Sequence, residues 1–158
     1  MSDPIFGETV PALLRRLLAD HRRLLPALQN WAESLSSPAR GTARERLEGL
    51  ASQLRTHARI EEETLFQAMA DILGSSALAG YEMQHDDIDE VLEELLATQD
   101  GLPQNATELA ERLLWYCESH FEIEEKHIFR EALQRLTSDQ WQALNARADQ
   151  LAAAGPAS

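Results

Sequence analysis

The sequence has few of the residues that interrupt helices or cross-link chains. Its 158 residues include only 7 glycines, 6 prolines and 1 cysteine. Because Cys117 is alone, a disulfide within the chain is excluded, and a reducing, cytoplasmic setting is favoured. No apolar run approaches the length of about 18 residues that a membrane-spanning helix needs. We also expect no signal peptide, because residues 1–4 do not begin a basic region followed by an apolar run.

Positive charge is scarce as well. The chain has 14 Lys and Arg against 27 Asp and Glu, which gives a formal net charge of −13 at pH 7. The phosphates of nucleic acids and the head groups of anionic membranes would repel such a chain, so neither is expected as a partner. The same charge also keeps a protein soluble, which is the simpler explanation for it, and it identifies no protein partner.

The abundant residues favour helices. Ala, Leu, Glu, Gln and Arg dominate the composition, and no run alternates Val, Ile or Thr with polar residues as a strand would. The length is that of one domain with a sizeable core. We therefore predict an all-α protein with a single domain over residues 1–158.

The apolar periodicity predicts four long helices and a short fifth one. Short connections favour antiparallel neighbours, so the four helices should form an up-down-up-down four-helix bundle. We expect an irregular arm over residues 1–8, the bundle over 9–136, and a C-terminal helix and tail over 137–158. The bundle helices should begin near residues 9, 42, 77 and 105 and end near 35, 73, 99 and 136.

Helix starts are predicted from capping residues. Thr9 is expected to cap the first helix. Asn105 with Glu108, and Thr137 with Gln140, fit the capping-box spacing at the fourth and fifth helices.

One pattern occurs twice. Residues 57–66 read HARIEEETLF and residues 120–129 read HFEIEEKHIF, so each segment contains His-x-x-x-Glu. Residues four apart on a helix lie on the same face, one turn apart. His57 with Glu61, and His120 with Glu124, should therefore each present an imidazole and a carboxylate to the bundle interior.

Two more histidines, His21 and His85, fall on the apolar faces of the first and third predicted helices. Burying unpaired ionisable groups is costly, and a metal would compensate for that cost directly. The alternative is a bundle whose polar core groups satisfy one another, which requires all six placements to be coincidental.

The helix lengths support a shared layer. With a rise of about 1.5 Å per residue, groups equally far from a turn lie at equal height in antiparallel helices. His21 and His57 are nearly equidistant from the turn near residue 38, as are His85 and His120 from the turn near 102. The remaining pair is offset by about four residues, or about 6 Å, which the span of a His-x-x-x-Glu pair can absorb.

Other acids of the repeat should face away from this layer. Glu62 and Glu125 lie five residues after their histidines, which on a helix is a rotation of about 140°. Glu122, two residues after His120, also points elsewhere. We expect these acids to be solvated and not to bind metal.

The ligand set favours a pair of iron ions. Four imidazoles and two carboxylates are too many for one tetrahedral zinc, whereas a mixed set suits iron, with the carboxylates bridging two ions. If each ion has six positions and shares a bridging oxygen, about two positions stay open for a diatomic or peroxide ligand.

The order His … His-x-x-x-Glu … His … His-x-x-x-Glu resembles the hemerythrin-like (HHE cation-binding) domain. The segments 20–22, 65–66 and 128–129 are similar to that family too, and the resemblance covers about residues 10–136. It implies a non-haem di-iron site with a bridging oxo, hydroxo or water. In that site the terminal ligands would be His21, His57, His85 and His120, and the bridges would be Glu61 and Glu124.

The chain departs from the oxygen-carrying hemerythrins at two positions. They have a second histidine on the third helix, where this chain has Asp89, and their second bridge is an aspartate one residue after the position of Glu124. The chain is therefore more similar to the HHE branch, which is associated with iron, oxygen, nitric oxide or peroxide. Asp89 could be a weak ligand, a hydrogen-bond partner of His85, or a solvated residue.

Three functions fit these patterns. The protein could bind or sense a small ligand, act as a di-iron oxidase or peroxidase, or be a metal-responsive interaction module. His127 could pack or be exposed, or could relay protons, and Tyr81 and Tyr116 could be core residues or could donate hydrogen bonds near the site. Cys117 is expected to be a buried small hydrophobe.

Overall fold

The structure is a computed structural model that describes residues 9–37 and 41–155. The predicted N-terminal arm and the last residues of the predicted tail lie outside this part. The described residues are all-α and form no strand, as predicted. The elements are α1 (Ala12–Ser34), α2 (Ala43–Glu61), η2 (Glu62–Phe66), α3 (Gln67–Leu73), α4 (Ser75–Leu95), α5 (Ala106–Lys126), α6 (Ile128–Arg135) and α7 (Ser138–Ala153).

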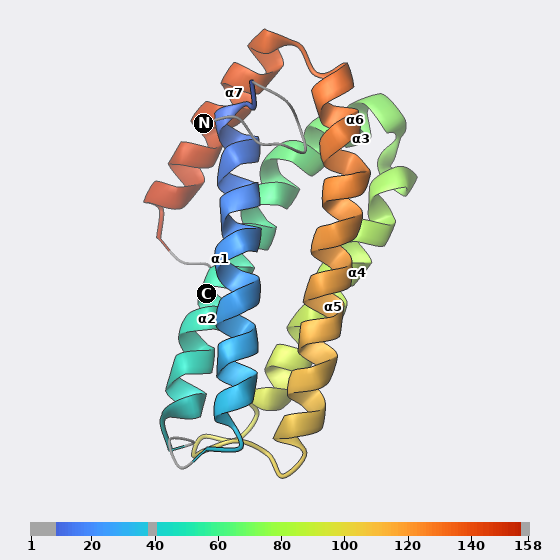
Figure 1. Ribbon diagram of the computed structural model, residues 1–158. Helices are drawn as coiled ribbons and strands as arrows, with labels where there is room; N and C mark the ends of the chain where they lie inside the picture. Colours follow the sequence, from blue (N-terminus) through green and yellow to red (C-terminus); the bar gives the residue numbers. More distant parts are fainter. Residues whose placement is uncertain (1–8, 38–40, 156–158) are drawn as a thin grey trace.

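These elements form four antiparallel columns, which confirms the predicted bundle (Figure 1). The columns are α1, then α2 with η2 and α3, then α4, then α5 with α6. Helix α1 packs against α2 and α5, and α4 packs against α5 and α3. Helix α7 runs obliquely along one side of the bundle, beside the upper part of α1 in Figure 1, and packs against α1, α2 and η2. None of the described helices is long and apolar enough to cross a membrane.

Two columns are interrupted, although both were predicted as continuous helices. The segment η2 is a π-helix, a winding that is rare and often found at functional sites. The other column breaks at His127, which has φ −122° and ψ −78°. Thr64 in the middle of η2 lies 63 residues before His127, so the interruptions occupy the same place in the two copies of the repeat.

Of the two capping boxes predicted for the later helices, the one before α7 is present and the one before α5 is absent. Thr137 and Gln140 form the predicted capping box: Gln140 N donates to Thr137 Oγ1 at 3.2 Å, and Thr137 N donates to Gln140 Oε1 at 2.8 Å. Asn105 makes no side-chain cap bond. Glu108 instead accepts a hydrogen bond from Arg112, one turn further along the exposed face of α5.

The start of α1 differs from the prediction. The helix begins at Ala12 with Pro11 in the N-cap position, so Thr9 is not its cap. A residue distant in sequence provides the missing acceptor: Leu13 N donates to Asn145 Oδ1 of α7 at 2.7 Å. The C-terminal helix therefore caps the first one, which local sequence could not indicate.

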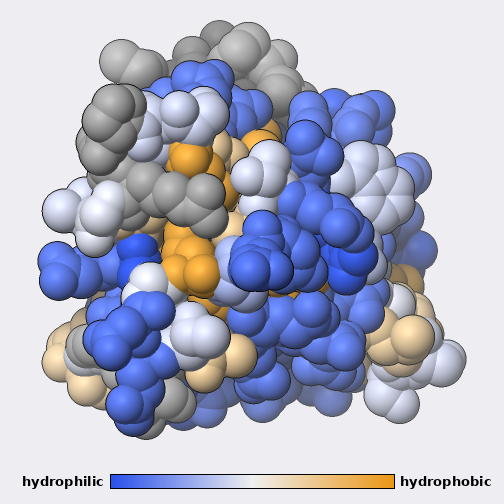
Figure 2. All heavy atoms as spheres, turned by 90° about the horizontal axis from the view of Figure 1, so that it is seen from below, coloured by the Kyte–Doolittle hydropathy of each residue, from blue (hydrophilic) through white to orange (hydrophobic). Residues whose placement is uncertain are grey.

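The core consists of two apolar clusters with a polar layer between them. One cluster includes Leu24, Trp31 and Cys117, and the other includes Leu17, Phe66 and Phe129 near α7. The molecular end that carries the turns after α1 and α4 is mostly hydrophilic, with strongly apolar side chains visible mainly near its middle (Figure 2). Cys117 is buried as predicted, and burial raises the pKa of its thiol to about 12.

Candidate metal centre

The polar layer brings together all six residues of the predicted ligand set. They come from four helices, and each is buried to an exposed fraction of 8% or less. Their side chains form two groups whose nitrogen and oxygen atoms lie within 4.8 Å of one another. The groups are His21, His57, Glu61 and Glu124, and Glu61, His85, His120 and Glu124.

Each glutamate lies between the two histidine pairs. Glu61 Oε1 contacts His57 Nε2, while its Oε2 lies 3.7 Å from His85 Nε2. Glu124 Oε1 lies 3.2 Å from His21 Nε2, and its Oε2 lies 3.3 Å from His120 Nε2. Each carboxylate thus directs one oxygen to each half of the layer, which is the arrangement a bridging carboxylate needs.

The outer nitrogens of the histidines contact oxygen acceptors, one for each ring. His21 Nδ1 lies 3.2 Å from Glu125, His57 Nδ1 2.9 Å from Asp20, His85 Nδ1 2.8 Å from Glu62, and His120 Nδ1 2.6 Å from Gln84. An oxygen at Nδ1 favours the tautomer with its hydrogen there and leaves the Nε2 lone pair directed inward. This is the second layer of contacts that typically orients metal-binding imidazoles.

The prediction that the outer acids of the repeat are solvated is wrong for two of them. Glu62 and Glu125 do stay outside both groups, but each is hydrogen-bonded to a histidine of a neighbouring helix. The rotation of these residues away from their own histidine directs them to the adjacent helix. Glu122 is exposed, as expected, and forms an ion pair with Lys126.

Most inner atoms of the layer lack hydrogen-bond partners, although the Nε2 atoms of His21 and His57 contact each other at 3.2 Å. Both oxygens of Glu61 and Glu124, and the Nε2 atoms of His85 and His120, are buried without a hydrogen bond. A buried polar atom without a partner costs free energy, and the cost is larger for a charged group. Lone pairs on oxygen and imidazole nitrogen that converge in this way form a donor set for cations, so the residues fit a metal site.

The pKa values reflect the crowding of like charges. Burial raises the pKa of Glu124 well above its ordinary value, and the neighbouring charge of Glu61 raises it further. Burial would also raise the pKa of Glu61, but the charge of His57 holds it well below the ordinary value. Burial would lower the pKa of His57, but Glu61 and Asp20 raise it to about 9. Burial lowers the pKa of His120 to about 3.

Aromatic rings enclose the layer and restrict its imidazoles. Phe121 stacks on His21 with ring centroids 4.0 Å apart and planes 10° from parallel. Phe66 stacks on His85 at 5.5 Å and 15°. Phe66 is one of the residues that the two copies of the repeat share, whereas sequence analysis assigned no role to Phe121. The position of Phe121 directly after His120 is a signal for contact with the layer.

Two cavities reach this layer from opposite sides. One of about 520 Å³ lies between α2 and α4 and touches His57, His85 and His120. The other, of about 680 Å³, lies between α1 and α5 and touches His21. Phe121 lines both cavities.

The remaining residues singled out from sequence lie outside the two groups. Asp89 lines the α2–α4 cavity, where its Oδ1 accepts a hydrogen bond from Arg55 Nε at 2.7 Å. His127 is exposed at the helix break. Tyr81 is half-buried beside Phe66, and burial raises its pKa.

The comparisons with known proteins agree with this geometry. The family model described as the hemerythrin HHE cation binding domain matches residues 12–132, which is most of the chain. No curated protein and no solved structure matches the chain. With the buried His/Glu layer and the matching helical bundle, this establishes that the chain belongs to the hemerythrin HHE cation-binding domain family.

Proposed function

We propose that the layer holds two non-haem iron ions and that the protein binds or senses a small ligand such as oxygen, nitric oxide or peroxide. The supporting observation is the placement of Glu61 and Glu124, each of which directs one oxygen to each pair of histidines. A set of imidazoles and carboxylates suits iron better than a soft metal that prefers thiolates.

In this proposal the protein supplies ligands, orientation and shielding. His21 and His57 would hold one ion, His85 and His120 the other, and the glutamates would bridge them with an oxo, hydroxo or water. The partners at Nδ1 fix the imidazoles, and the stacked Phe121 and Phe66 exclude water from the rings. Bound iron would supply the open coordination positions and the redox chemistry. We also propose that residues 1–158 form one domain and that the protein is cytoplasmic, which its single cysteine supports.

Metal analysis with absorption spectroscopy tests this function. Metal-free protein is loaded with ferrous iron without oxygen, freed of excess metal, and then exposed to air, nitric oxide or peroxide. We expect two irons per chain and a new absorption band with at least one of these ligands. A chain that takes up no transition metal and keeps its full stability without one would contradict the proposal.

The α2–α4 cavity favours a second candidate, a di-iron oxidase or peroxidase. Its volume of about 520 Å³ exceeds what a diatomic molecule needs and lies in the range of small-molecule sites. Steady-state turnover with peroxide and an organic reductant would support this candidate. A stable spectral adduct without turnover would exclude it.

The partnerless buried atoms favour a third candidate, a metal-responsive interaction module. Without a cation the layer keeps the desolvation cost of Glu61 and Glu124, so the bundle should loosen on metal loss. Hydrogen exchange of metal-free and loaded protein tests this idea. Equal protection in both forms would rule it out.

A further inference from the structure

We infer that the cavity between α2 and α4 is the route by which a divalent cation reaches the buried layer, and that Asp86 and Glu93 on its rim attract the ion. This inference rests on the proposed metal-binding function. The identity of the ligands does not determine the path by which the metal ion reaches them.

The inner end of the cavity leads to atoms that lack partners. His85 and His120 line the cavity, with exposed fractions of 8% and 1%, and neither Nε2 has a hydrogen-bond partner. The apolar side chains of Leu54, Ile88 and Phe121 complete the inner wall. A cation that enters from this side therefore meets the rings of these two histidines, and their buried Nε2 atoms lie just behind, facing the layer.

The rim of the cavity is acidic. Four acids and two arginines line it, so its formal charge is −2: Glu62, Asp86, Asp89 and Glu93 against Arg55 and Arg59. Arg55 is paired with Asp89 at 2.7 Å, and Arg59 with Glu63 at 2.7 Å. Within the part of the chain that the structure describes, Asp86 and Glu93 form no hydrogen bond or ion pair, and both are exposed residues that line the cavity.

These two acids are well placed to act together. They are seven residues apart on α4, about two helical turns, and therefore share one side of the helix. A cleft lined by one sign of charge with low-dielectric walls concentrates the field and raises the local concentration of counter-ions. The unpaired carboxylates on the rim should therefore raise the rate at which a dication enters.

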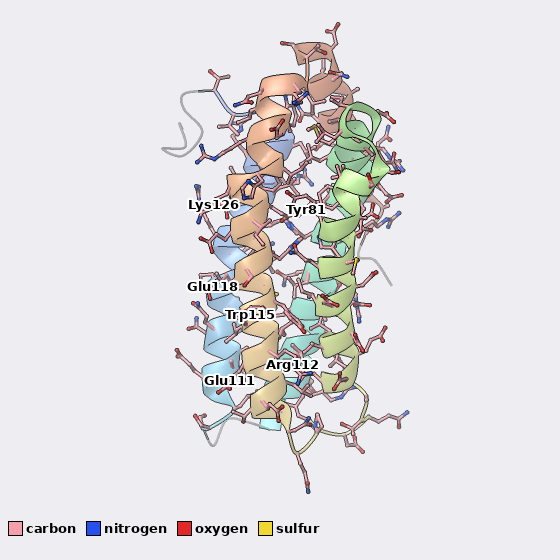
Figure 3. All side chains as sticks on the ribbon, turned by 90° about the vertical axis from the view of Figure 1, so that its right-hand side faces the viewer. Tyr81, Glu111, Arg112, Trp115, Glu118 and Lys126 are labelled. Atoms are coloured by element: carbon pink, nitrogen blue, oxygen red, sulfur yellow. The ribbon has the colours of Figure 1, made fainter. Side chains whose placement is uncertain are left out.

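The cavity on the opposite side lacks this property. It is lined by three acids and three bases, so it carries no net charge: Glu118, Glu122 and Glu125 against Arg22, Lys126 and Arg130. Glu118 and Lys126 extend from α5 on the side toward α1 (Figure 3). This cavity reaches the layer only at His21, among the six residues of the two groups, and the ring of Phe121 is stacked on that imidazole.

The rim acids should guide the cation without binding it tightly. Among the described residues, only the two groups in the layer bring three or more potential ligand atoms within 4.8 Å of one another. Asp86 and Glu93 should therefore change how fast the ion arrives and leave the final metal content unchanged.

The rate of metal uptake tests the inference. Metal-free protein is mixed with Co²⁺ at about 10 mM ionic strength, where the screening length is about 30 Å, and uptake is followed by visible absorption in a stopped-flow instrument. The variant D86N/E93Q should take up the same final amount as the native chain but about three- to tenfold more slowly. At about 1 M salt, where the screening length is about 3 Å, the difference should vanish.

The matched control is E118Q/E122Q, which removes the same charge from the rim of the other cavity. It should load at nearly the native rate. Equal slowing of both double variants, or no slowing of D86N/E93Q, would overturn the route. A native chain that binds no Co²⁺ would instead contradict the metal site itself, so the two failures are distinguishable.

Discussion

The two halves of the metal layer have nearly the same construction, and one chemical difference between them is informative. In each half, the residue before the first histidine contacts the second histidine, so Asp20 contacts His57 and Gln84 contacts His120. In each half, the glutamate after the bridging one contacts a histidine of the other half. The layer therefore has an approximate twofold relation, and at the Nδ1 atoms the exchange of Asp20 for Gln84 alters the type of contact.

The two buried imidazoles that contact Asp20 and Gln84 are in different electrostatic states, and the charge of Glu61 contributes more to the raised pKa of His57 than Asp20 does. His57 lies between two carboxylates, and its pKa is raised to about 9. His120 has a neutral amide at Nδ1, and burial lowers its pKa to about 3. A carboxylate partner makes an imidazole a stronger donor to a metal, so the halves should differ in metal affinity although their shapes match.

The largest effect is expected from removing a residue that both halves share. Glu61→Ala or Glu124→Ala should abolish tight binding in both halves, because each glutamate directs one oxygen to each pair of histidines. Glu62→Ala and Glu125→Ala are the controls and should retain metal. The measurement is metal per chain after loading and gel filtration. Equal metal content in all four variants would contradict the assignment of the bridges.

Removing a histidine should separate the halves. His57→Ala is expected to empty the α1–α2 half, and His120→Ala the α4–α5 half, so that each variant holds one ion in place of two. Titration of metal-free variants with Co²⁺ gives the stoichiometry. If either variant loses both ions or keeps both, the halves are not separable units.

Metal affinity should depend on pH through His57, which belongs only to the α1–α2 half, and through Glu124, which both halves share. His57 must lose its proton to bind a metal, and its pKa of about 9 lies above neutral pH. Apparent affinity should therefore increase about tenfold per pH unit from about pH 7 to 9 and level off above that. In His120→Ala, which keeps only the α1–α2 half, the slope should remain. A flat profile in this variant would contradict the assigned charge of His57.

The smallest expected effect comes from making the halves chemically alike. Gln84→Glu places a carboxylate at His120 Nδ1 and should strengthen binding in the α4–α5 half about tenfold, whereas Gln84→Ala should weaken it about tenfold. Competition with a chelator measures both affinities. If Gln84→Glu binds no better than the native chain, the exchange of Asp20 for Gln84 does not tune the site.

Much of this architecture followed from periodicity. The spacing of His57 and Glu61 fixes their shared helix face, and equal distances from a turn place His21 beside His57, so the composition of the layer could be predicted. Contacts between helices could not be derived in this way. The partners of the outer nitrogens depend on how the helices are rotated against each other, and Asn145 reaches Leu13 across 132 positions of the chain.

Local winding was also beyond prediction. A π-helix differs from an α-helix by one residue in its hydrogen-bond spacing, and η2 contains the same apolar and acidic residues that predict an α-helix. The break at His127 likewise follows a regular apolar stripe. Only the structure shows that the π-helix around Thr64 and the helix break at His127 lie at equivalent positions of the repeat.

The π-helical segment has a consequence for how this family member tolerates changes in length. A π-helical hydrogen bond spans one residue more than an α-helical one, so deletion of one residue within η2 would return the segment to α-helical winding. His57 and Glu61 precede this segment, and the buried Met69 follows it. Such a deletion would alter the packing of Met69 against its neighbours and leave the register of the upstream ligands unchanged.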